Sequence, residues 1–346
     1  MTNRREFLQT TLGMGAMALA GRAWGGETAP TRPLKVCVFS DLHYCPGVFV
    51  NDTPAFLEQI LARAEAEKCD MVIHLGDFVH DVSKPYAKAF LKTYNEFKIP
   101  TYHCLGNHDQ EGTTYQQTCE AYRMRDGHYF FDRGGFRFVV ADPNYWRNEE
   151  TGAYVHYQRF TYGGGKNRTL NWIPPEQLDW LCETIETSPN PCVVLSHQSF
   201  ERPTNGAGVQ NKDAVQAIFN AANAKCPGKV RLVMNGHLHT DYLRLLDNIL
   251  YWDVNSANYA WFDKTHTCYP ADYVKTHRLA NHNLGWARPL SAILTLTREG
   301  GVKIDGAKAD WLYGVTPQQA NLARFDANGR FFTPTIQSAN FKFVYD

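Results

Sequence analysis

The chain has 346 residues, which is enough for one large domain or two ordinary ones. Its 35 Lys and Arg residues balance its 35 Asp and Glu residues, so it lacks the net positive field that attracts a nucleic-acid polymer. We therefore expect no nucleic-acid polymer as a partner, although a bound metal ion could still attract a small anion.

The N-terminus has the pattern of an export signal. Arg4 and Arg5 precede a Gly- and Ala-rich apolar stretch that runs to Ala20, which is shorter and less apolar than a membrane span of about 20 apolar residues. Residues 1–23 resemble a cleavable twin-arginine (Tat) signal, and residues 24–33 a linker. We expect the Tat machinery to export the chain to the periplasm or the extracellular space, with no stable membrane span after cleavage. The alternative is an uncleaved amphipathic anchor.

The nine cysteines do not form a zinc-binding pattern, because no CxxC occurs in the sequence. Cys37, Cys104 and Cys192 lie inside apolar runs and are predicted to be thiols in the core. An odd number of cysteines leaves at least one thiol unpaired.

Short apolar runs alternate with helical patterns along most of the chain. The predicted buried strands are 34–40, 70–75, 101–105, 191–196 and 230–235. The predicted helices are 54–68, 85–97, 174–186 and 212–225. Proline lies near the start of three of these helices, where it is well tolerated. The alternation predicts an α/β fold with helical crossovers.

Two hairpin patterns and two aromatic segments interrupt this alternation. Apolar runs flank glycine pairs at 134–135 and 300–301, so the sheet is mixed or there are two sheets. Residues 145–172 and 255–286 are rich in aromatic side chains without clear periodicity. We expect both segments to be ordered and to form walls around a site.

A polar motif follows each of the five predicted strands. The motifs are Asp41-Leu42-His43, Gly76-Asp77, Gly106-Asn107-His108-Asp109, His197, and Gly236-His237-Leu238-His239. Because ligands of open α/β sheets bind outside the carboxyl ends of the strands, five such motifs should converge on one crevice.

The side chains of these motifs are suited to metal ions. Carboxylate, imidazole and amide oxygen without thiolate favour Mn, Fe, Co or Zn. Seven candidate ligands are too many for one closed structural zinc site. Two divalent ions that share one carboxylate would use all seven.

The motifs DxH, GD, GNH followed by an acid, a lone His and GHxH occur in that order from Asp41 to His239. In this the chain resembles the calcineurin-like metallophosphoesterase family over roughly residues 34–300. The resemblance implies a four-layer α/β/β/α sandwich of two mixed sheets. We expect this domain to span residues 34–307, with residues 308–346 packed on it as a C-terminal extension.

The resemblance also implies a role for each ligand. It implies that Asp41, His43 and His239 bind the first ion and that Asn107, His197 and His237 bind the second. Asp77 would bridge the two ions.

The activity implied is that of an exported, metal-dependent phosphoesterase with a small phosphorylated substrate. A hydroxide activated between the two ions would attack phosphorus. His108 would be catalytic, stabilising the transition state or protonating the leaving oxygen. One alternative is a phosphodiesterase of cyclic-nucleotide or nucleotide-diphosphate type. An alternative of another class is a non-catalytic metal-binding interaction module on the same fold.

One motif departs from the family pattern. Many members read GDxxD, with a second Asp that orients the catalytic His, whereas this chain has His80 and then Asp81 after Asp77. Either His80 takes that role or Asp81 reaches in from the next position. We place His80, Asp81 and Asp109 around the ligands.

Other side chains are candidates for substrate contact. The cations that could hold a distal phosphate or sugar, or could instead be exposed loop residues, are Arg147, Arg159, Lys166, Arg168 and Arg202. The histidine candidates in the second aromatic segment are His266, His277 and His282.

Overall fold

The computed structural model of the protein describes residues 32–158, 167–202 and 208–344, which contain two six-stranded mixed sheets. The first sheet has the order β17-β16-β15-β1-β2-β3. Its parallel strands are β1 (Leu34–Phe39), β2 (Met71–His74) and β3 (Thr101–His103). Its antiparallel strands are β15 (Ala292–Leu296), β16 (Gly301–Asp305) and β17 (Ala339–Lys342).

The second sheet has the order β11-β12-β10-β9-β5-β4. Its parallel strands are β5 (Phe136–Val140), β9 (Cys192–Leu195), β10 (Val230–Asn235) and β12 (Ile249–Asp253). The antiparallel edge strands are β4 (Tyr129–Arg133) and β11 (Tyr242–Leu246).

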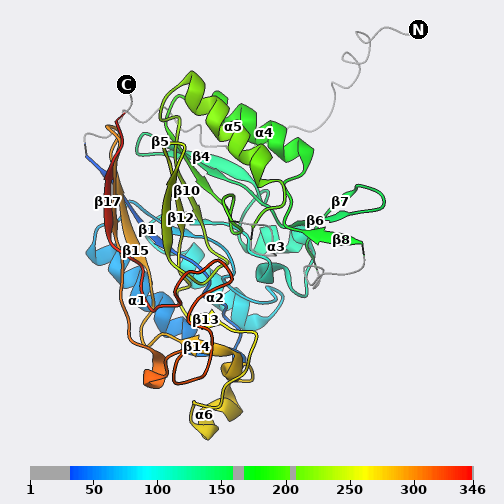
Figure 1. Ribbon diagram of the computed structural model, residues 1–346, viewed down its shortest axis with the longest axis vertical. Helices are drawn as coiled ribbons and strands as arrows, with labels where there is room; N and C mark the ends of the chain where they lie inside the picture. Colours follow the sequence, from blue (N-terminus) through cyan, green and yellow to red (C-terminus); the bar gives the residue numbers. More distant parts are fainter. Residues whose placement is uncertain (1–31, 159–166, 203–207, 345–346) are drawn as a thin grey trace.

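Helices cover the outer faces of both sheets (Figure 1). Those on the first sheet are α1 (Thr53–Ala66), α2 (Pro85–Asn95) and α3 (Tyr115–Ala121). Those on the second sheet are α4 (Pro175–Glu186) and α5 (Lys212–Lys225). The expected α/β/β/α arrangement with two mixed sheets is therefore confirmed.

The side chains of β1 alternate between the two faces of the first sheet. Val36 and Val38 join the core between the two sheets, whereas Cys37 and Phe39 join the core beneath the helices of the first sheet. Both faces of the strand are buried, which explains why it is a continuous apolar run rather than an alternating pattern.

The five predicted strands and four predicted helices are all present, close to their predicted bounds. The two predicted hairpins form as β4–β5 and β15–β16. Gly134 and Gly135 have φ values of 58° and 78° in the first turn, a backbone conformation that glycine adopts without steric cost.

The two aromatic segments fold differently from each other. The first contains a small sheet of β6 (Tyr145–Asn148), β7 (Tyr154–His156) and β8 (Arg168–Leu170). In Figure 1 this sheet projects from the body of the molecule. The second contains β13 (Tyr259–Trp261), the helix α6 (Ala271–Thr276) and β14 (Asn283–Gly285), and β13 pairs with β14. The described residues also contain three short 3-10 helices, at His108–Gln110, Ala280–His282 and Leu312–Gly314.

The segment after residue 307 adds β17 to the edge of the first sheet. It also forms a turn at residues 324–332, which we call the C-terminal loop. Within this loop the backbone N–H of Phe332 donates to the carbonyl of Arg324 at 3.1 Å, and Asp326 N–H donates to the carbonyl of Arg330 at 2.8 Å.

All nine cysteines are free thiols, and Cys37, Cys104 and Cys192 are fully buried as predicted. Within the described residues, no helix has the length and apolar character that a bilayer crossing requires. Residues 1–31, which include the predicted Tat signal, lie outside the described residues.

Candidate metal centre

Side chains from the carboxyl ends of β1, β2, β9 and β10 meet between the two sheets. Asp41, His43 and His239 form one group, and the ligand atoms that they offer lie within 4.8 Å of one another. The three residues come from the loops that follow β1 and β10, which belong to different sheets. Each group of this kind can hold a metal ion.

A second group adjoins the first and consists of Asp77, His197 and His237. His197 Nε2 lies 3.1 Å from Asp77 Oδ2 and 4.0 Å from Asp41 Oδ1. His43 Nε2 in turn lies 3.6 Å from Asp77 Oδ2. Asp77 therefore faces both groups, as a carboxylate shared by two ions must.

Several polar atoms of the centre are buried without a hydrogen-bond partner among the described residues. They are Asp41 Oδ1, Asn107 Oδ1 and His197 Nε2. Unpaired buried polar atoms are rare and require an explanation. Each of the three is a lone-pair donor that a cation would satisfy. This donor set therefore fits the metal ions that the sequence implies.

The backbone of the centre is held in a sparsely populated conformation. Asp41, His43, Asp77, His237 and His239 all have positive φ, between 50° and 70°. Left-handed φ is uncommon for residues other than glycine and persists only where the surrounding structure enforces it. The conformation turns five of the seven predicted ligands away from the strand directions and towards one point.

Three glycines leave room for these side chains. A Cβ atom on Gly76 would lie 2.6 Å from Cγ of His197, and one on Gly106 would lie 2.7 Å from Cγ of Asp77. A Cβ atom on Gly236 would lie 2.6 Å from Asp41 Oδ2. Any larger residue at these positions would displace a predicted ligand.

Backbone carbonyls orient two of the histidines. The Nδ1 atoms of His197 and His239 both lie 2.8 Å from a carbonyl oxygen, of Leu75 and Tyr259 respectively. A carbonyl oxygen only accepts, so each Nδ1 carries a proton and Nε2 is the ring nitrogen left to bind a metal ion at the centre.

A glutamate that the sequence analysis missed completes a chain of imidazoles. Glu111 Oε1 accepts from His108 Nδ1 at 2.7 Å, and Glu111 Oε2 accepts from His80 Nδ1 at 3.0 Å. His80 Nε2 lies 3.0 Å from His43 Nδ1. Because His80 Nδ1 carries a proton, its neutral Nε2 accepts from His43 Nδ1, and His43 Nε2 is left to bind metal.

Charges in this chain support that assignment. Burial raises the pKa of Glu111, but hydrogen bonds to both imidazoles outweigh burial and hold the pKa below its usual value. Burial and neighbouring His108 lower the pKa of His80. Burial also lowers the pKa of His108, but Asp77 and Glu111 outweigh it and raise that pKa. The glutamate is thus ionised and His80 neutral.

The carboxylates of Asp41 and Asp77 give the centre a negative potential. Burial lowers the pKa of His43 to about 3, so this imidazole is neutral and has a lone pair to offer. Burial would also lower the pKa of His197, but Asp77 and Asp41 raise it to about 9. A centre that holds a proton this strongly attracts cations, which agrees with its donor set.

Asp109 and Asp81, which were also predicted to lie around the ligands, occupy different positions. Asp109 is fully buried and accepts from the backbone N–H groups of Gly106, Asp77, Phe78 and Val79 at 2.8 to 3.1 Å. It therefore fixes the GD and GNH loops against each other.

Asp81 does not reach the chain of imidazoles. Its carboxylate is 3.1 Å from the backbone N–H of Ser83 and 3.3 Å from Lys84 Nζ. His80 and Asp81 were the two candidates for orienting His108. Of these, His80 lies beside the His108 ring, with the ring centroids 4.5 Å apart. The carboxylate that bonds to His108 comes instead from Glu111.

Two further polar residues position the first loop. Ser256 Oγ donates to the carbonyl of Asp41 at 2.9 Å, and Asn258 Nδ2 donates to the carbonyl of Leu42 at 2.8 Å. Both are fully buried. Their signal in the sequence was the polar run NSAN directly after an apolar strand, the same pattern that revealed the other motifs.

A cavity of about 800 Å³ opens beside the two groups. Its floor includes predicted ligands, and its walls come from the second aromatic segment and the C-terminal loop. The expectation that aromatic segments wall a site is confirmed for residues 255–286. Among the described residues of 145–172, none lines this cavity.

The candidate substrate contacts mostly have structural partners. Arg202 is fully buried and pairs with Asp253 at 3.0 Å and Asp326 at 3.1 Å. Arg147 and Arg168 lie over aromatic rings of the small sheet, those of Tyr154 and Trp146 respectively. The three histidine candidates, His266, His277 and His282, do not line the cavity. Arg159 and Lys166 lie outside the described residues.

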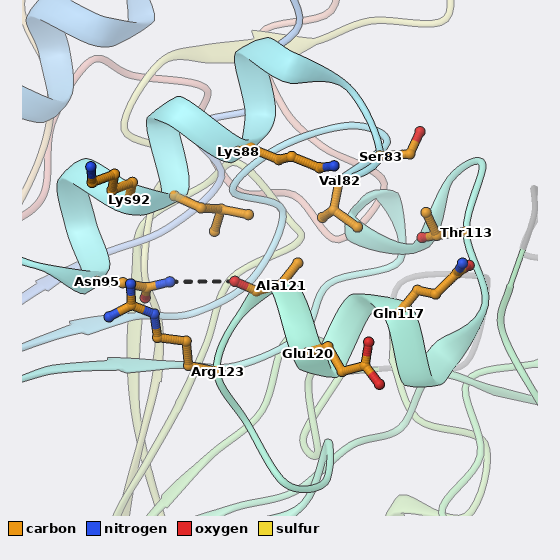
Figure 2. Close-up of a pocket in the computed structure, with 11 residues that line it drawn as sticks. Val82, Ser83, Lys88, Lys92, Asn95, Thr113, Gln117, Glu120, Ala121 and Arg123 are labelled. Carbon is orange, nitrogen blue, oxygen red and sulfur yellow. Dashed lines mark hydrogen bonds between the residues drawn. The ribbon is translucent and has the colours of Figure 1, made fainter.

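A second hollow of about 500 Å³ lies between α2 and α3. Figure 2 shows that side chains of both helices border it, including Lys88 and Lys92 of α2 and Gln117 of α3, and that Asn95 donates to the carbonyl of Ala121. None of the predicted site residues lines this hollow.

Comparison with known proteins agrees with this geometry. The sequence model for calcineurin-like phosphoesterases matches residues 34–241. A dimetal phosphatase from Danio rerio is similar with a TM-score of 0.57 and 13% identity, over 81% of this chain and 98% of that chain. PhoD is similar with a TM-score of 0.50 and 15% identity, over 80% of this chain and 66% of PhoD. At these identities the two structures show a common fold. The search of curated proteins found no match.

Proposed function

The chain belongs to the calcineurin-like phosphoesterase family, whose members hydrolyse phosphoester bonds, and on this premise we propose that its catalytic centre holds two divalent metal ions. The observation that carries the proposal is the pair of adjoining groups around Asp77. Mn, Fe, Zn or Co suit the imidazole and carboxylate donors.

We assign the ligands on the basis of this grouping. Asp41, His43 and His239 hold the first ion, because their donor atoms form one group. His197 and His237 hold the second together with Asn107, whose buried Oδ1 has no protein partner among the described residues. Asp77 would contribute its carboxylate to both ions, because it lies near His43 of the first group and His197 of the second.

When bound, the ions supply Lewis-acid charge to the phosphoryl oxygens and acidify a water molecule. Hydrolysis breaks the bond between phosphorus and the leaving oxygen, forms one from phosphorus to the water oxygen, and transfers one proton to the leaving group. His108 lines the cavity and is placed to give that proton. The proton comes from Nε2, because Nδ1 donates to Glu111.

The test uses purified chain reconstituted separately with Mn²⁺, Zn²⁺, Fe²⁺ and Co²⁺. Metal content is measured by mass spectrometry, and hydrolysis of p-nitrophenyl phosphate and bis-p-nitrophenyl phosphate is followed by absorbance. We expect two ions per chain and activity that is lost in His108→Ala. Two bound ions with no hydrolysis of either ester would instead favour a metal-binding interaction module. The preferred ester separates phosphomonoesterase from phosphodiesterase.

Export is a separate proposal, supported by the twin arginines and the apolar stretch of residues 1–23. We propose that this segment directs the chain through the Tat machinery. The measurement is the N-terminal sequence of the protein recovered from the periplasm. Arg4→Lys combined with Arg5→Lys should block the export, and unchanged export of that variant would overturn the proposal.

A further inference from the structure

The wall of the cavity beside the metal centre is mostly apolar and aromatic. Beyond the predicted ligands, the chain of imidazoles and Glu111, the large apolar residues that line the cavity are Val48, Phe49, Leu238, Tyr259, Trp261, Leu279 and Phe332. A site for a sugar or polyol would instead need many hydrogen-bonding groups, since an unpaired hydroxyl loses its bonds with water on entry.

The rings of this wall are held in place by their neighbours. Phe49 stacks on Tyr259 with ring centroids 5.3 Å apart and an angle of 13°. Trp261 stacks on His282 at 5.4 Å and 8°. Because the rings are already ordered, little side-chain entropy is lost when a ligand packs against them.

Trp261 is the exposed residue of β13. Tyr259 and the intervening alanine of β13 are buried, whereas Trp261 is 40% exposed. One face of the indole lies on His282, and the residue lines the cavity. A large exposed ring on a fixed support beside a catalytic centre is suited to stack on a planar ligand.

Charges in the wall do not favour a second phosphate. Among the described residues that line the cavity, Arg278 is the one lysine or arginine, and Asp263 and Asp326 also line it. Asp326 is itself paired with Arg202, so Arg278 and Asp263 remain and their charges balance. The wall thus has no net positive charge to hold further phosphates, and an uncharged leaving group is favoured.

Most of the wall lies beyond the segment that matches the family. Tyr259, Trp261, Leu279 and Phe332 all follow residue 241. Phe332 belongs to the C-terminal loop, which the buried Arg202 fixes through Asp326. Most of the wall therefore lies outside the segment that matches the family model.

We propose that this wall is a binding site for the leaving group, and that the substrate is a phosphate ester of an uncharged, apolar, aromatic alcohol or phenol. The phosphate lies at the centre between Asp41 and Asp77, and the aromatic ring packs between Trp261 and Phe332. This inference rests on the proposed phosphoesterase activity.

The test compares each variant with wild type on two esters, 1-naphthyl phosphate and β-glycerol phosphate. Trp261→Ala and Phe332→Ala should each raise KM for the naphthyl ester about tenfold, because each loses the ring surface that the naphthyl group covers. KM for the glycerol ester should change less than about twofold, since glycerol is too small and polar to use the wall. Comparing each variant with wild type on the same ester removes differences in leaving-group reactivity.

Phe130→Ala is the matched control. Phe130 is an aromatic residue with 45% exposure on β4, and it does not line the cavity. It should leave KM for both esters unchanged. Equal KM changes for both esters in Trp261→Ala, or none for either, would overturn the proposal.

A binding measurement separates this proposal from the activity. Calorimetry with 1-naphthylmethylphosphonate, which cannot be hydrolysed, should show weaker binding to metal-loaded Trp261→Ala than to metal-loaded wild type. If wild type binds this compound but hydrolyses neither ester, the proposed activity fails while the wall remains a binding site. If Trp261→Ala binds it as tightly as wild type, the wall proposal fails whatever the activity.

Discussion

His108 Nδ1 donates to Glu111 Oε1 at 2.7 Å, across three residues of one turn. The other carboxylate oxygen of the same glutamate accepts from His80, which in turn accepts from His43. Glu111 thereby orients the imidazole that we propose to be catalytic, and it fixes the ring proton of His43, a proposed metal ligand. It takes the place of the second Asp of the GDxxD motif, which this chain lacks.

Glu111→Gln should lower kcat about a hundredfold at saturating metal, the usual size of a general acid contribution. The amide cannot accept from both imidazoles, so His108 loses its orientation. KM should change little, because Glu111 acts on the imidazole that donates the proton. Steady-state kinetics measures both constants.

Glu120→Gln is the control for this change, because Glu120 is an exposed residue of α3 whose carboxylate accepts from Gln116 at 3.0 Å and does not line the cavity. It should match wild type. Glu111→Asp keeps the charge and should recover part of kcat. A large rise in KM with unchanged kcat in Glu111→Gln would contradict the positioning role.

Two aspartates of one loop should respond differently to the same substitution. Asp77→Asn replaces the carboxylate that faces both metal groups. It should lower the metal affinity and the activity, each by about tenfold to a hundredfold. Asp81→Asn should retain two ions and full activity, because Asp81 contacts Ser83 and Lys84. Metal analysis after gel filtration checks both, and metal loss in Asp81→Asn would show that this residue reaches the centre after all.

Gly236 is predicted to be intolerant of any side chain. A Cβ atom there would lie 2.6 Å from Asp41 Oδ2 and closer still to Ser40 Oγ. Gly236→Ala should therefore lower the free energy of unfolding by about 1–3 kcal/mol, as overpacking does, and should reduce the metal content. Thermal unfolding and metal analysis measure the two effects.

The control for Gly236→Ala is Gly314→Ala, where no atom lies within 4 Å of the new Cβ. Gly314 has φ of 70°, so alanine there costs about 1 kcal/mol from the backbone alone. This variant should keep its metal. If Gly236→Ala also keeps both ions, close packing at this glycine is not what positions Asp41.

The sequence predicted the strands and the centre because both depend on local patterns. A buried parallel strand is a short apolar run, and its carboxyl end carries the polar motif. His237 and His239 therefore could be placed beside Asp41 before any contact was known. The structure brings them together, with His239 Nε2 3.3 Å from Asp41 Oδ1.

What the sequence could not predict are contacts that depend on side-chain reach. Glu111 lies one turn beyond the GNH motif, and nothing in its spacing shows that its carboxylate bridges two imidazoles. The role of Arg202 was left open between phosphate binding and an exposed loop position. The structure shows a third arrangement, a fully buried ion pair, because its partners are remote in sequence.

Arg202 should therefore be a stability determinant rather than a phosphate ligand. Its guanidinium is fully buried and bonds with Asp253, Asp326 and Thr240. Arg202→Met removes the charge and keeps similar length, which leaves Asp326 without its buried partner. The free energy of unfolding should fall by about 3–5 kcal/mol, the usual cost of breaking a buried pair.

The matched control is Arg244→Met. Arg244 pairs with Glu201, but 45% of its side chain is exposed, and exposed pairs contribute about 0–1 kcal/mol. Urea unfolding of both variants gives the comparison. Arg202→Met should also release the C-terminal loop and raise KM for 1-naphthyl phosphate, because Phe332 then loses its fixed position. If Arg202→Met is as stable as Arg244→Met but loses affinity for every phosphate ester equally, Arg202 binds phosphate and the structural role is wrong.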